Sequence, residues 1–297
     1  MAERAESLVE YYRQNRFNPV LIKVEDAPVW QEHLAKRRNL YENHLKLPLS
    51  LLAGRSVIEF GPNSGENALV LAVYGADLTL VEANEQVLPR LRELFAKFEA
   101  GERISALHNL SLEAFQTEER FQVAIAEGFL YTLPERDKML KKIAGLLCPG
   151  GFGIVSYNDR CGGLLECLRR LMLFRLYELE GTGEAHSEAS LAVARRLLGE
   201  DFARLKASRT FETWWKDTLV NPYYAPQWLW SFPEVVKLLE ECECRPYATS
   251  PVWAAVDHFL WYKNPLSAAQ RQARWLENWR ARVPYFMSGL APLSGAE

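Results

Sequence analysis

The sequence predicts an α/β fold: a doubly wound, mostly parallel seven-stranded sheet with helices on both faces. Short apolar strands alternate with amphipathic helices between residues 55 and 157. A glycine-containing loop joins the first strand to the first helix, and two further strands follow a long helical insertion. The 297 residues suffice for one large domain or for a core domain with a substantial insertion.

Five short apolar strands are expected in the core, at 55–60, 78–82, 104–107, 121–127 and 152–157. Amphipathic helices separate them at 66–74, 88–98 and 136–147. Pro89 must lie in the first turn of its helix, because a proline deeper inside would break it. Pro149-Gly-Gly151 is expected to end the last of these helices before the fifth strand. Strands and helices joined by short links predict βαβ units and therefore parallel pairing.

Helical segments flank this core. We predict an N-terminal helical cap over 1–50, a Rossmann-like core over 51–160, a helical and aromatic insertion over 161–230, completion of the sheet over 231–264, and a C-terminal helix and tail over 265–297. The two last strands are expected at 245–252 and 257–262. The Arg-rich C-terminal helix contains Trp275 and Trp279, and it could form a homodimer contact or pack on its own domain.

The composition excludes several classes of protein. Hydrophobic residues make up 48% of the chain and charged residues 25%, as in ordinary globular proteins, and no apolar run is long enough for a transmembrane helix. The net charge of -3 argues against broad nucleic-acid binding, so we expect neither DNA nor a membrane as partner. Five scattered cysteines and a charged N-terminus suit the cytoplasm, and no cysteine or histidine spacing predicts a metal site.

The most informative stretch is the loop Val57-Ile-Glu-Phe-Gly-Pro-Asn-Ser-Gly65. Gly61 and Gly65 lack a Cβ, so the backbone can bend sharply there and approach a ligand closely. The amides of the following helix would face that ligand with partial positive charge. A dinucleotide fingerprint needs three glycines around a pyrophosphate, whereas here Glu59 precedes the first glycine and would repel it. The same carboxylate favours an ammonium group, such as that of a methionine moiety.

Three further motifs follow in order. Glu82 ends the second strand, where a carboxylate can accept both hydroxyl hydrogens of a ribose. Glu127-Gly-Phe-Leu-Tyr131 follows the fourth strand, and a Pro-Gly-Gly turn precedes the fifth. Together with the glycine loop, these motifs favour an S-adenosylmethionine (SAM) site over a dinucleotide site.

At this point the chain resembles the class I SAM-dependent methyltransferase family over about residues 50–160. The resemblance implies SAM as cofactor and S-adenosylhomocysteine as its product. It implies that the glycine loop holds the methionine part, that Glu82 binds the ribose, that Leu110 and Ser111 flank the adenine, and that the loop beginning at Glu127 lies beside the sulfonium. The expected cofactor-binding residues are Glu59, Gly61, Pro62, Asn63, Gly65, Glu82, Ala83, Leu110, Ser111, Glu127, Gly128 and Phe129.

The chain departs from the family pattern at two positions. Asn63 stands where the family usually has the middle glycine, and asparagine is the other residue that best tolerates a left-handed conformation. Ser111 stands where the family usually has an aspartate beside the adenine, which weakens that assignment. Arg37, in the N-terminal segment, could meet the methionine carboxylate or an acidic substrate, or lie on a solvated helix face.

The methyl acceptor is less constrained. The insertion is rich in aromatic side chains, which suggest a closed pocket for a small molecule but also serve to pack helices: Phe202, Phe211, Trp214, Trp215, Tyr223, Tyr224, Trp228, Trp230 and Phe232. Tyr131 and Asp159 follow the fourth and fifth strands and should lie at the carboxyl edge, where ligands bind in open α/β sheets. With His258, near the end of the sheet, they are the candidate catalytic residues.

We therefore predict a SAM-dependent methyltransferase acting on a small molecule, for example on a sugar or natural-product hydroxyl. A general base is needed only if the acceptor must lose a proton. Two alternatives stay open at this point. The first is a methyltransferase that acts on a protein or RNA partner, which requires an open or basic surface. The second is a SAM-binding protein without catalytic activity.

Overall fold

The computed structural model describes residues 8–13, 22–204, 209–224, 229–250 and 266–288. Five strands lie in this part of the chain: β1 (Ser56–Phe60), β2 (Asp77–Val81), β3 (Ile104–His108), β4 (Phe121–Ala126) and β5 (Leu147–Val155). They form one parallel sheet in the order β3-β2-β1-β4-β5. β1 pairs with both β2 and β4, so the chain winds outward from β1 in one direction and from β4 in the other. The carboxyl ends of β1 and β4 flank the switch point where such sheets bind ligands.

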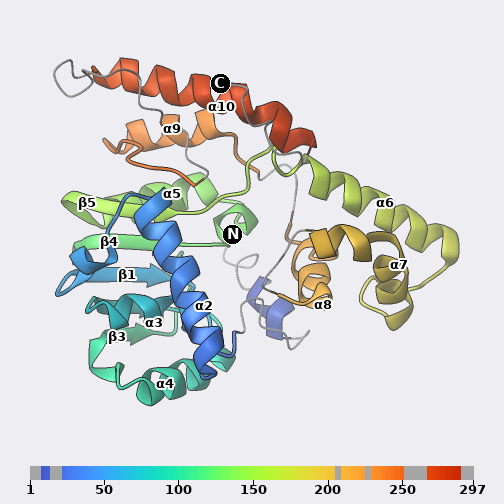
Figure 1. Ribbon diagram of the computed structural model, residues 1–297, viewed down its shortest axis with the longest axis horizontal. Coiled ribbons are helices and arrows are strands. Elements are labelled where there is room, and N and C mark those ends of the chain that lie inside the picture. Colours follow the sequence, from blue (N-terminus) through green and yellow to red (C-terminus); the bar gives the residue numbers. More distant parts are fainter. Residues whose placement is uncertain (1–7, 14–21, 205–208, 225–228, 251–265, 289–297) are drawn as a thin grey trace.

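Helices cover both faces of the sheet, as the alternating pattern predicts (Figure 1). On one face lie α2 (Ala27–Arg38), α3 (Glu66–Val73) and α4 (Leu88–Lys97); on the other lie α5 (Arg136–Gly145) and α9 (Phe232–Glu241). A π-helical segment (Asn39–His44) extends α2, and short 3-10 turns lie at Leu49–Leu52, Glu85–Val87, Gly101–Arg103 and Leu130–Thr132. Pro89 lies in the first turn of α4, as expected.

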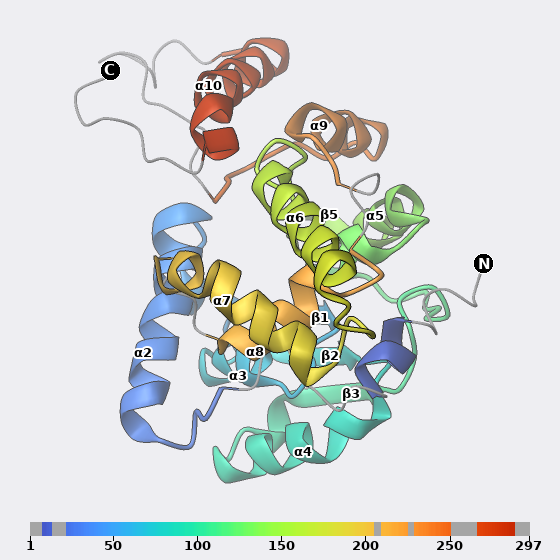
Figure 2. The ribbon, with the colours of Figure 1, turned by 90° about the vertical axis from the view of Figure 1, so that its right-hand side faces the viewer.

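The predicted insertion contains α6 (Leu164–Glu180), α7 (Glu188–Arg204), α8 (Phe211–Trp214) and a π-helical turn (Trp215–Leu219). These helices share an apolar core of their own, in which Trp214 and Trp215 are buried. At the base of the insertion, Asp159 forms an isolated parallel bridge with Trp230. Viewed from its own side, the insertion lies in front of the sheet, so it faces the strands' carboxyl ends (Figure 2).

The seven-stranded sheet is not seen in the described residues. The first of the two expected last strands, 245–252, is not a strand over residues 245–250, which are described. Pro246 has no amide hydrogen for a ladder, and Tyr247 packs edge-on against Phe152 with ring centroids 5.2 Å apart. The second expected strand, 257–262, lies outside the described residues, as does His258.

The Pro-Gly-Gly segment is also placed differently from the prediction. The fifth strand begins at Leu147 rather than at Phe152, so the turn lies inside β5. Phe121 pairs with Leu147 and Val123 with Phe152, which leaves only Gln122 of β4 opposite the segment 148–151. The turn is therefore a bulge, because the strand rejoins the ladder on both sides of it.

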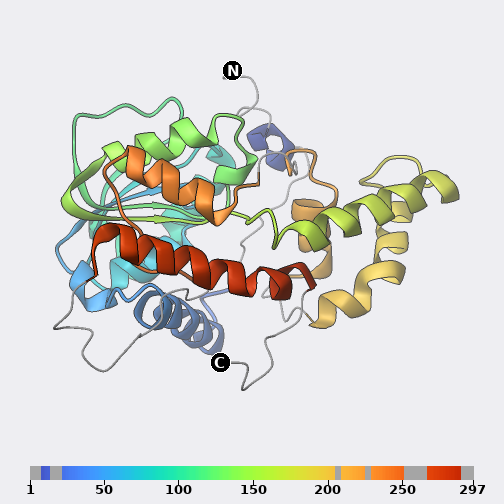
Figure 3. The same ribbon diagram turned by 90° about the horizontal axis from the view of Figure 1, so that it is seen from above.

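The C-terminal helix α10 (Ala268–Ser288) packs on its own chain. Figure 3 shows α10 beside α9, and Trp275 stacks on Phe232 with ring centroids 6.1 Å apart. Trp279 donates a hydrogen bond from Nε1 to Asp159, at 3.3 Å. The helix thus packs on its own domain, and the homodimer contact stays a prediction.

Candidate functional site

The loop after β1 forms the centre of the candidate cofactor site. Gly61, Asn63 and Gly65 all have positive φ angles, of 67°, 55° and 91°. Asn63 thus adopts the left-handed conformation that the family glycine would adopt freely. A Cβ on Gly61 would lie 3.2 Å from the Phe129 ring, so glycine lets the loop after β4 approach this closely.

Glu59 brings a buried carboxylate to this loop. Its side chain lies at the end of β1, and its Oε2 atom is buried without a hydrogen-bond partner. Burial, followed by the negative charge of Glu127, raises the pKa of Glu59 to about 8. A buried acceptor without a donor carries a desolvation cost, which an ammonium group would relieve.

Glu82 connects the first two loops of the site. Its carboxylate accepts hydrogen bonds from the backbone amides of Asn63 and Asn84, each at 2.8 Å. Burial raises the pKa of Glu82, and these amide hydrogen bonds oppose the rise. Each carboxylate oxygen has a second lone pair, so Glu82 retains acceptor capacity for ribose hydroxyls while it positions the glycine loop.

The loops after β2 and β3 meet beside Glu82. Asn109 donates from Nδ2 to the carbonyl oxygens of Glu82 and Ala83, at 2.8 and 3.3 Å. Leu110 is 42% exposed, and the Ser111 hydroxyl accepts a hydrogen bond from the amide of Ala114 at 3.3 Å. An exposed apolar side chain next to the expected ribose position suits the face of an adenine ring.

The loop after β4 is tied to the N-terminal helix by a largely buried ion pair. Arg37 of α2 binds both carboxylate oxygens of Glu127, at 2.8 and 2.9 Å, and also donates to the hydroxyl of Tyr41 at 3.3 Å. The Nε atom of Arg37 is buried without a partner. Arg37 is thus neither a solvated side chain nor fully satisfied, since one donor is free for an acidic group.

The residues present fit the methionine end of SAM. Glu59 has a buried acceptor without a donor, and Arg37 has a buried donor without an acceptor. The two residues are close enough for their charges to affect one another. An amino acid carries one ammonium and one carboxylate, so it would complete both groups at once.

On the acceptor side, the structure brings Tyr131 together with the insertion. Its ring meets that of Tyr224 edge-on, with centroids 5.8 Å apart, and the side chain of Asn158 hydrogen-bonds to both phenols. Burial, and then the charge of Asp217, raises the pKa of Tyr131 above its ordinary value. The phenol is therefore neutral near pH 7 and acts as a hydrogen-bonding group.

Asp159, the second catalytic candidate, has a different environment. Its Oδ1 atom accepts the backbone amides of Cys161 and Gly162, at 2.8 and 3.3 Å. Its Oδ2 atom accepts the amide of Phe232, at 3.1 Å, as well as the Trp279 indole. These bonds tie the end of β5 to α9 and α10, and the catalytic role that its position predicts stays a prediction.

Four residues near Tyr131 were not predicted as site residues: Tyr12, Asn158, Arg209 and Asp217. The hydroxyl of Tyr12 donates to Oδ1 of Asp217 at 3.2 Å, and Arg209 donates to Oδ2 at 2.6 Å. Asn158 directly precedes Asp159 in the loop after β5. Its position after a strand could therefore have indicated a site residue, as it did for Asp159. The contacts of Tyr12 and Asp217 span 205 positions, and no local pattern indicates them.

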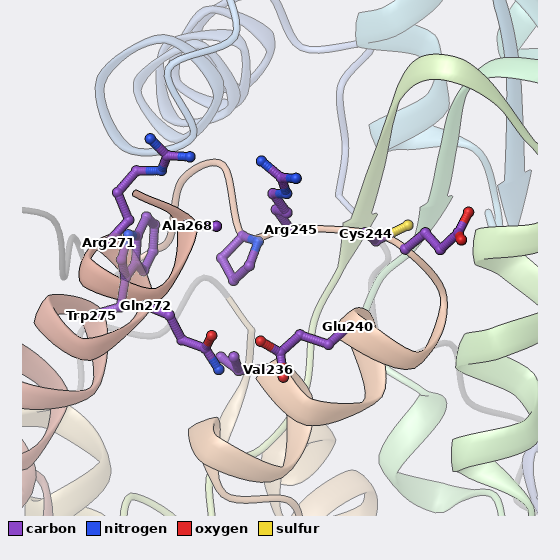
Figure 4. Close-up of a pocket in the computed structure, with 10 residues that line it drawn as sticks. Val236, Glu240, Cys244, Arg245, Ala268, Arg271, Gln272 and Trp275 are labelled. Atoms are coloured by element: carbon purple, nitrogen blue, oxygen red, sulfur yellow. The ribbon is translucent and has the colours of Figure 1, made fainter. Parts of the chain in front are cut away.

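Two cavities among the described residues lie away from these loops. One, of about 470 Å³, lies between α9, the segment 243–246 and α10, beside Trp275 (Figure 4). The other, of about 710 Å³, follows the outer edge of β5 and includes the Pro-Gly-Gly bulge. Neither is lined by the glycine loop, by Glu82 or by the loop of Glu127. Among described residues, no group of three or more His, Cys, Asp or Glu could hold a metal ion, and no helix could span a membrane.

Comparison with known proteins gives a family and a fold. A family model described as a methyltransferase domain matches residues 30–217. No curated protein matches the chain. Among solved structures, PKMT2 from Rickettsia typhi aligns with 87% of this chain and 50% of its own length, at 18% identity and a TM-score of 0.58.

Two further solved structures match a smaller part. The CcbJ methyltransferase from Streptomyces caelestis is 28% identical over 42% of this chain and 51% of its own, with a TM-score of 0.37. The glycopeptide N-methyltransferase MtfA is 18% identical over 43% and 52%, with a TM-score of 0.36. The matched regions thus cover about half the length of each of these three proteins.

Proposed function

This chain belongs to the methyltransferase domain family, whose methyl donor is SAM, and we propose that it methylates a small molecule at the carboxyl edge of its sheet. The observation that carries the SAM part of this proposal is the pair of buried, unsatisfied groups on Glu59 and Arg37, which match the two charges of an amino acid. Bound SAM supplies an electrophilic methyl group on a sulfonium.

The residues of the site divide the binding of SAM between them. Glu59 would hold the ammonium and Arg37 Nε the carboxylate of the methionine part, while Glu82 would accept the ribose hydroxyls. Phe129, whose ring closes over Gly61, would exclude water beside the sulfonium. Methyl transfer disperses charge, so alignment and a partly desolvated site supply much of the acceleration.

A small acceptor is supported by the way in which other segments cover this edge. Residues 8–13 lie against the insertion, where the hydroxyl of Tyr11 donates to the carbonyl of Lys216 at 2.6 Å. The same segment reaches the loop after β2 through Arg13, which pairs with Glu85 at 3.4 Å. A site covered from two sides favours a small molecule over a large protein or RNA surface.

Titration calorimetry with SAM and with S-adenosylhomocysteine tests the cofactor part. We expect both to bind, and Glu82→Ala to weaken binding by at least tenfold because the ribose loses its acceptor. Glu93→Ala, on an exposed position of α4, is the matched control and should leave the affinity unchanged. Thermal melting of each variant separates a lost ligand contact from a lost fold.

If the wild-type protein bound neither SAM nor S-adenosylhomocysteine, the proposal would be wrong. An unchanged affinity in Glu82→Ala would refute only the ribose role. Transfer of labelled methyl groups to proteins or RNA, and not to small molecules, would leave the cofactor site intact and overturn the choice of acceptor.

A further inference from the structure

A polar cluster lies between the carboxyl edge and the insertion, outside the cofactor residues. We call it the acceptor-side cluster; its members are Tyr12, Tyr131, Asn158, Asp217 and Tyr224. They come from the N-terminal segment, from the loops after β4 and β5, and from the insertion. The cluster therefore forms only when these separate parts of the chain have packed together.

Asp217 is the carboxylate of this cluster, and its side chain is only 14% exposed. Oδ1 accepts the hydroxyl of Tyr12, and Oδ2 accepts a guanidinium hydrogen of Arg209. A second nitrogen of Arg209 donates to the Thr218 hydroxyl at 2.9 Å, which holds the guanidinium in place. The carboxylate is thus oriented with one oxygen toward the phenol.

The phenols of the cluster are neutral groups. Burial, followed by the charge of Asp217, raises the pKa of Tyr12 and of Tyr131. Tyr12 lies close enough to Tyr131 for the two rings to affect each other's ionisation. A neutral phenol can accept a proton on its oxygen only while it passes its own proton on, and Asp217 is placed to receive it.

The charges around the cluster disfavour a cationic acceptor. Asp217 is paired with Arg209, and Glu166 with Arg169. Arg170 brings a further positive charge, since it donates to the carbonyls of Thr218 and Leu219 and lies over the Tyr224 ring. Arg169 also pairs with Asp201, so each of these three carboxylates already has an arginine partner. None of the three is left for an added ammonium, whereas a hydroxyl would meet hydrogen-bonding partners.

We propose that the methyl acceptor is a neutral hydroxyl group bound against Tyr131, and that its proton leaves through Tyr12 to Asp217. The inference rests on the proposed function and names the class of substrate. As the new C–O bond forms, the carbon–sulfur bond breaks and its electron pair stays on the sulfur. The hydroxyl proton passes to the Tyr12 oxygen while the Tyr12 proton passes to Oδ1 of Asp217, so charge and atoms balance.

Methyl transfer from radiolabelled SAM to four small probes tests this proposal. Umbelliferone, a phenol, and methyl glucoside, an alcohol, carry neutral hydroxyls; benzylamine carries an ammonium and benzoate a carboxylate. We expect label on the hydroxyl probes and little on the charged ones. Tyr12→Phe should lower transfer to the alcohol on the order of a hundredfold, as the loss of general-base assistance does.

The acidity of the acceptor gives a readout that a merely structural role of Tyr12 would not change. A phenol loses its proton more easily than an alcohol, so Tyr12→Phe should reduce transfer to umbelliferone less than transfer to methyl glucoside. Asp217→Asn should show the same order. Tyr247→Phe and Asp77→Asn are the matched controls, because both residues lie outside the cluster, and they should behave as wild type.

Each remaining outcome counts against the proposal. Preferred methylation of benzylamine or benzoate would overturn the hydroxyl assignment, and so would no label on any probe by a protein that binds SAM. Equal losses for phenol and alcohol would overturn the proton path. Failure to bind SAM would instead count against the proposed function, so the two failures are distinguishable by calorimetry.

Discussion

The two halves of the candidate site are built differently. In the cofactor half, Glu82 accepts the amide of Asn84, two residues away, and that of Asn63 in the preceding loop, although Arg37 reaches Glu127 across 90 positions. In the acceptor half, Tyr12 meets Asp217 across 205 positions of the chain. The glycine loop and Glu82 of the cofactor half can therefore be predicted from local sequence motifs, while the acceptor half depends on how distant segments pack.

The charges of the two halves differ as well. Glu59 keeps a buried carboxylate oxygen without a partner, whereas Asp217 has both oxygens bonded by protein donors. An unsatisfied group costs stability and is available to a ligand; a satisfied group stabilises and orients its neighbours. The comparison predicts that mutations in the cofactor half weaken SAM binding, and that mutations in the insertion cost stability without loss of SAM.

The largest effect is expected inside the insertion. Trp215 is buried there, and its Nε1 donates to the Tyr177 hydroxyl at 2.9 Å. Trp215→Ala should destabilise the protein by about 4 kcal/mol, because it leaves a large cavity, yet SAM should still bind. Urea unfolding and calorimetry measure the two quantities. Leu171→Ala, at an exposed position of α6, is the control; loss of SAM binding in Trp215→Ala would contradict the independence of the two halves.

A somewhat smaller loss is expected in the cofactor half when its ion pair is broken. Arg37→Ala leaves Glu127 without its partner in a buried site and should cost about 3 kcal/mol, with weaker SAM binding. Arg38→Ala, at the next position, removes an exposed arginine paired with Glu42 and should change little. Equal stability of the two variants in urea would show that the buried pair contributes nothing.

Glu59→Gln should separate stability from binding. The folded pKa of Glu59, about 8, lies above the unfolded value, so the folded state holds the extra proton and its stability falls as pH rises between the two values. Glutamine has no proton to lose, and the variant should be more stable by on the order of 2 kcal/mol at pH 8 in the absence of SAM. Its SAM affinity should drop.

For the wild type, SAM affinity should rise with pH up to about 8, because the carboxylate form of Glu59 binds the ammonium. Calorimetry across this range measures the slope. A SAM affinity that does not change with pH would contradict the binding of the ammonium by Glu59. So would a Glu59→Gln variant whose stability falls with pH as that of the wild type does.

The smallest effect concerns Asn63, which sits at a φ of 55°. Asn63→Ala should cost about 1 kcal/mol, because alanine tolerates the left-handed conformation less well. Asn63→Gly, which restores the residue usual in the family, should be close to neutral in stability and in SAM affinity. Thermal melting checks both, and an equal loss in the two variants would mean that the Asn63 side chain, not its backbone, matters.

Local patterns account for what could be predicted. The five core strands and the helices between them lie within a few residues of their predicted positions, because a buried strand and an amphipathic helix each have their own apolar period. The exception is β5, because the Pro-Gly-Gly sequence predicts a turn that ends a helix before the strand begins. Only the pairing with β4 makes it an internal bulge.

By itself, the sequence determined the parallel core, the glycine loop and the family to which the chain belongs, since each depends on residues close together in the chain. Only the tertiary structure decided that Arg37 pairs with Glu127, that Asp159 anchors α9 and α10, and that Tyr12 meets Asp217. The physical reason is that burial and hydrogen-bond partners are properties of packed segments, and packing over such separations has no signature in a local pattern.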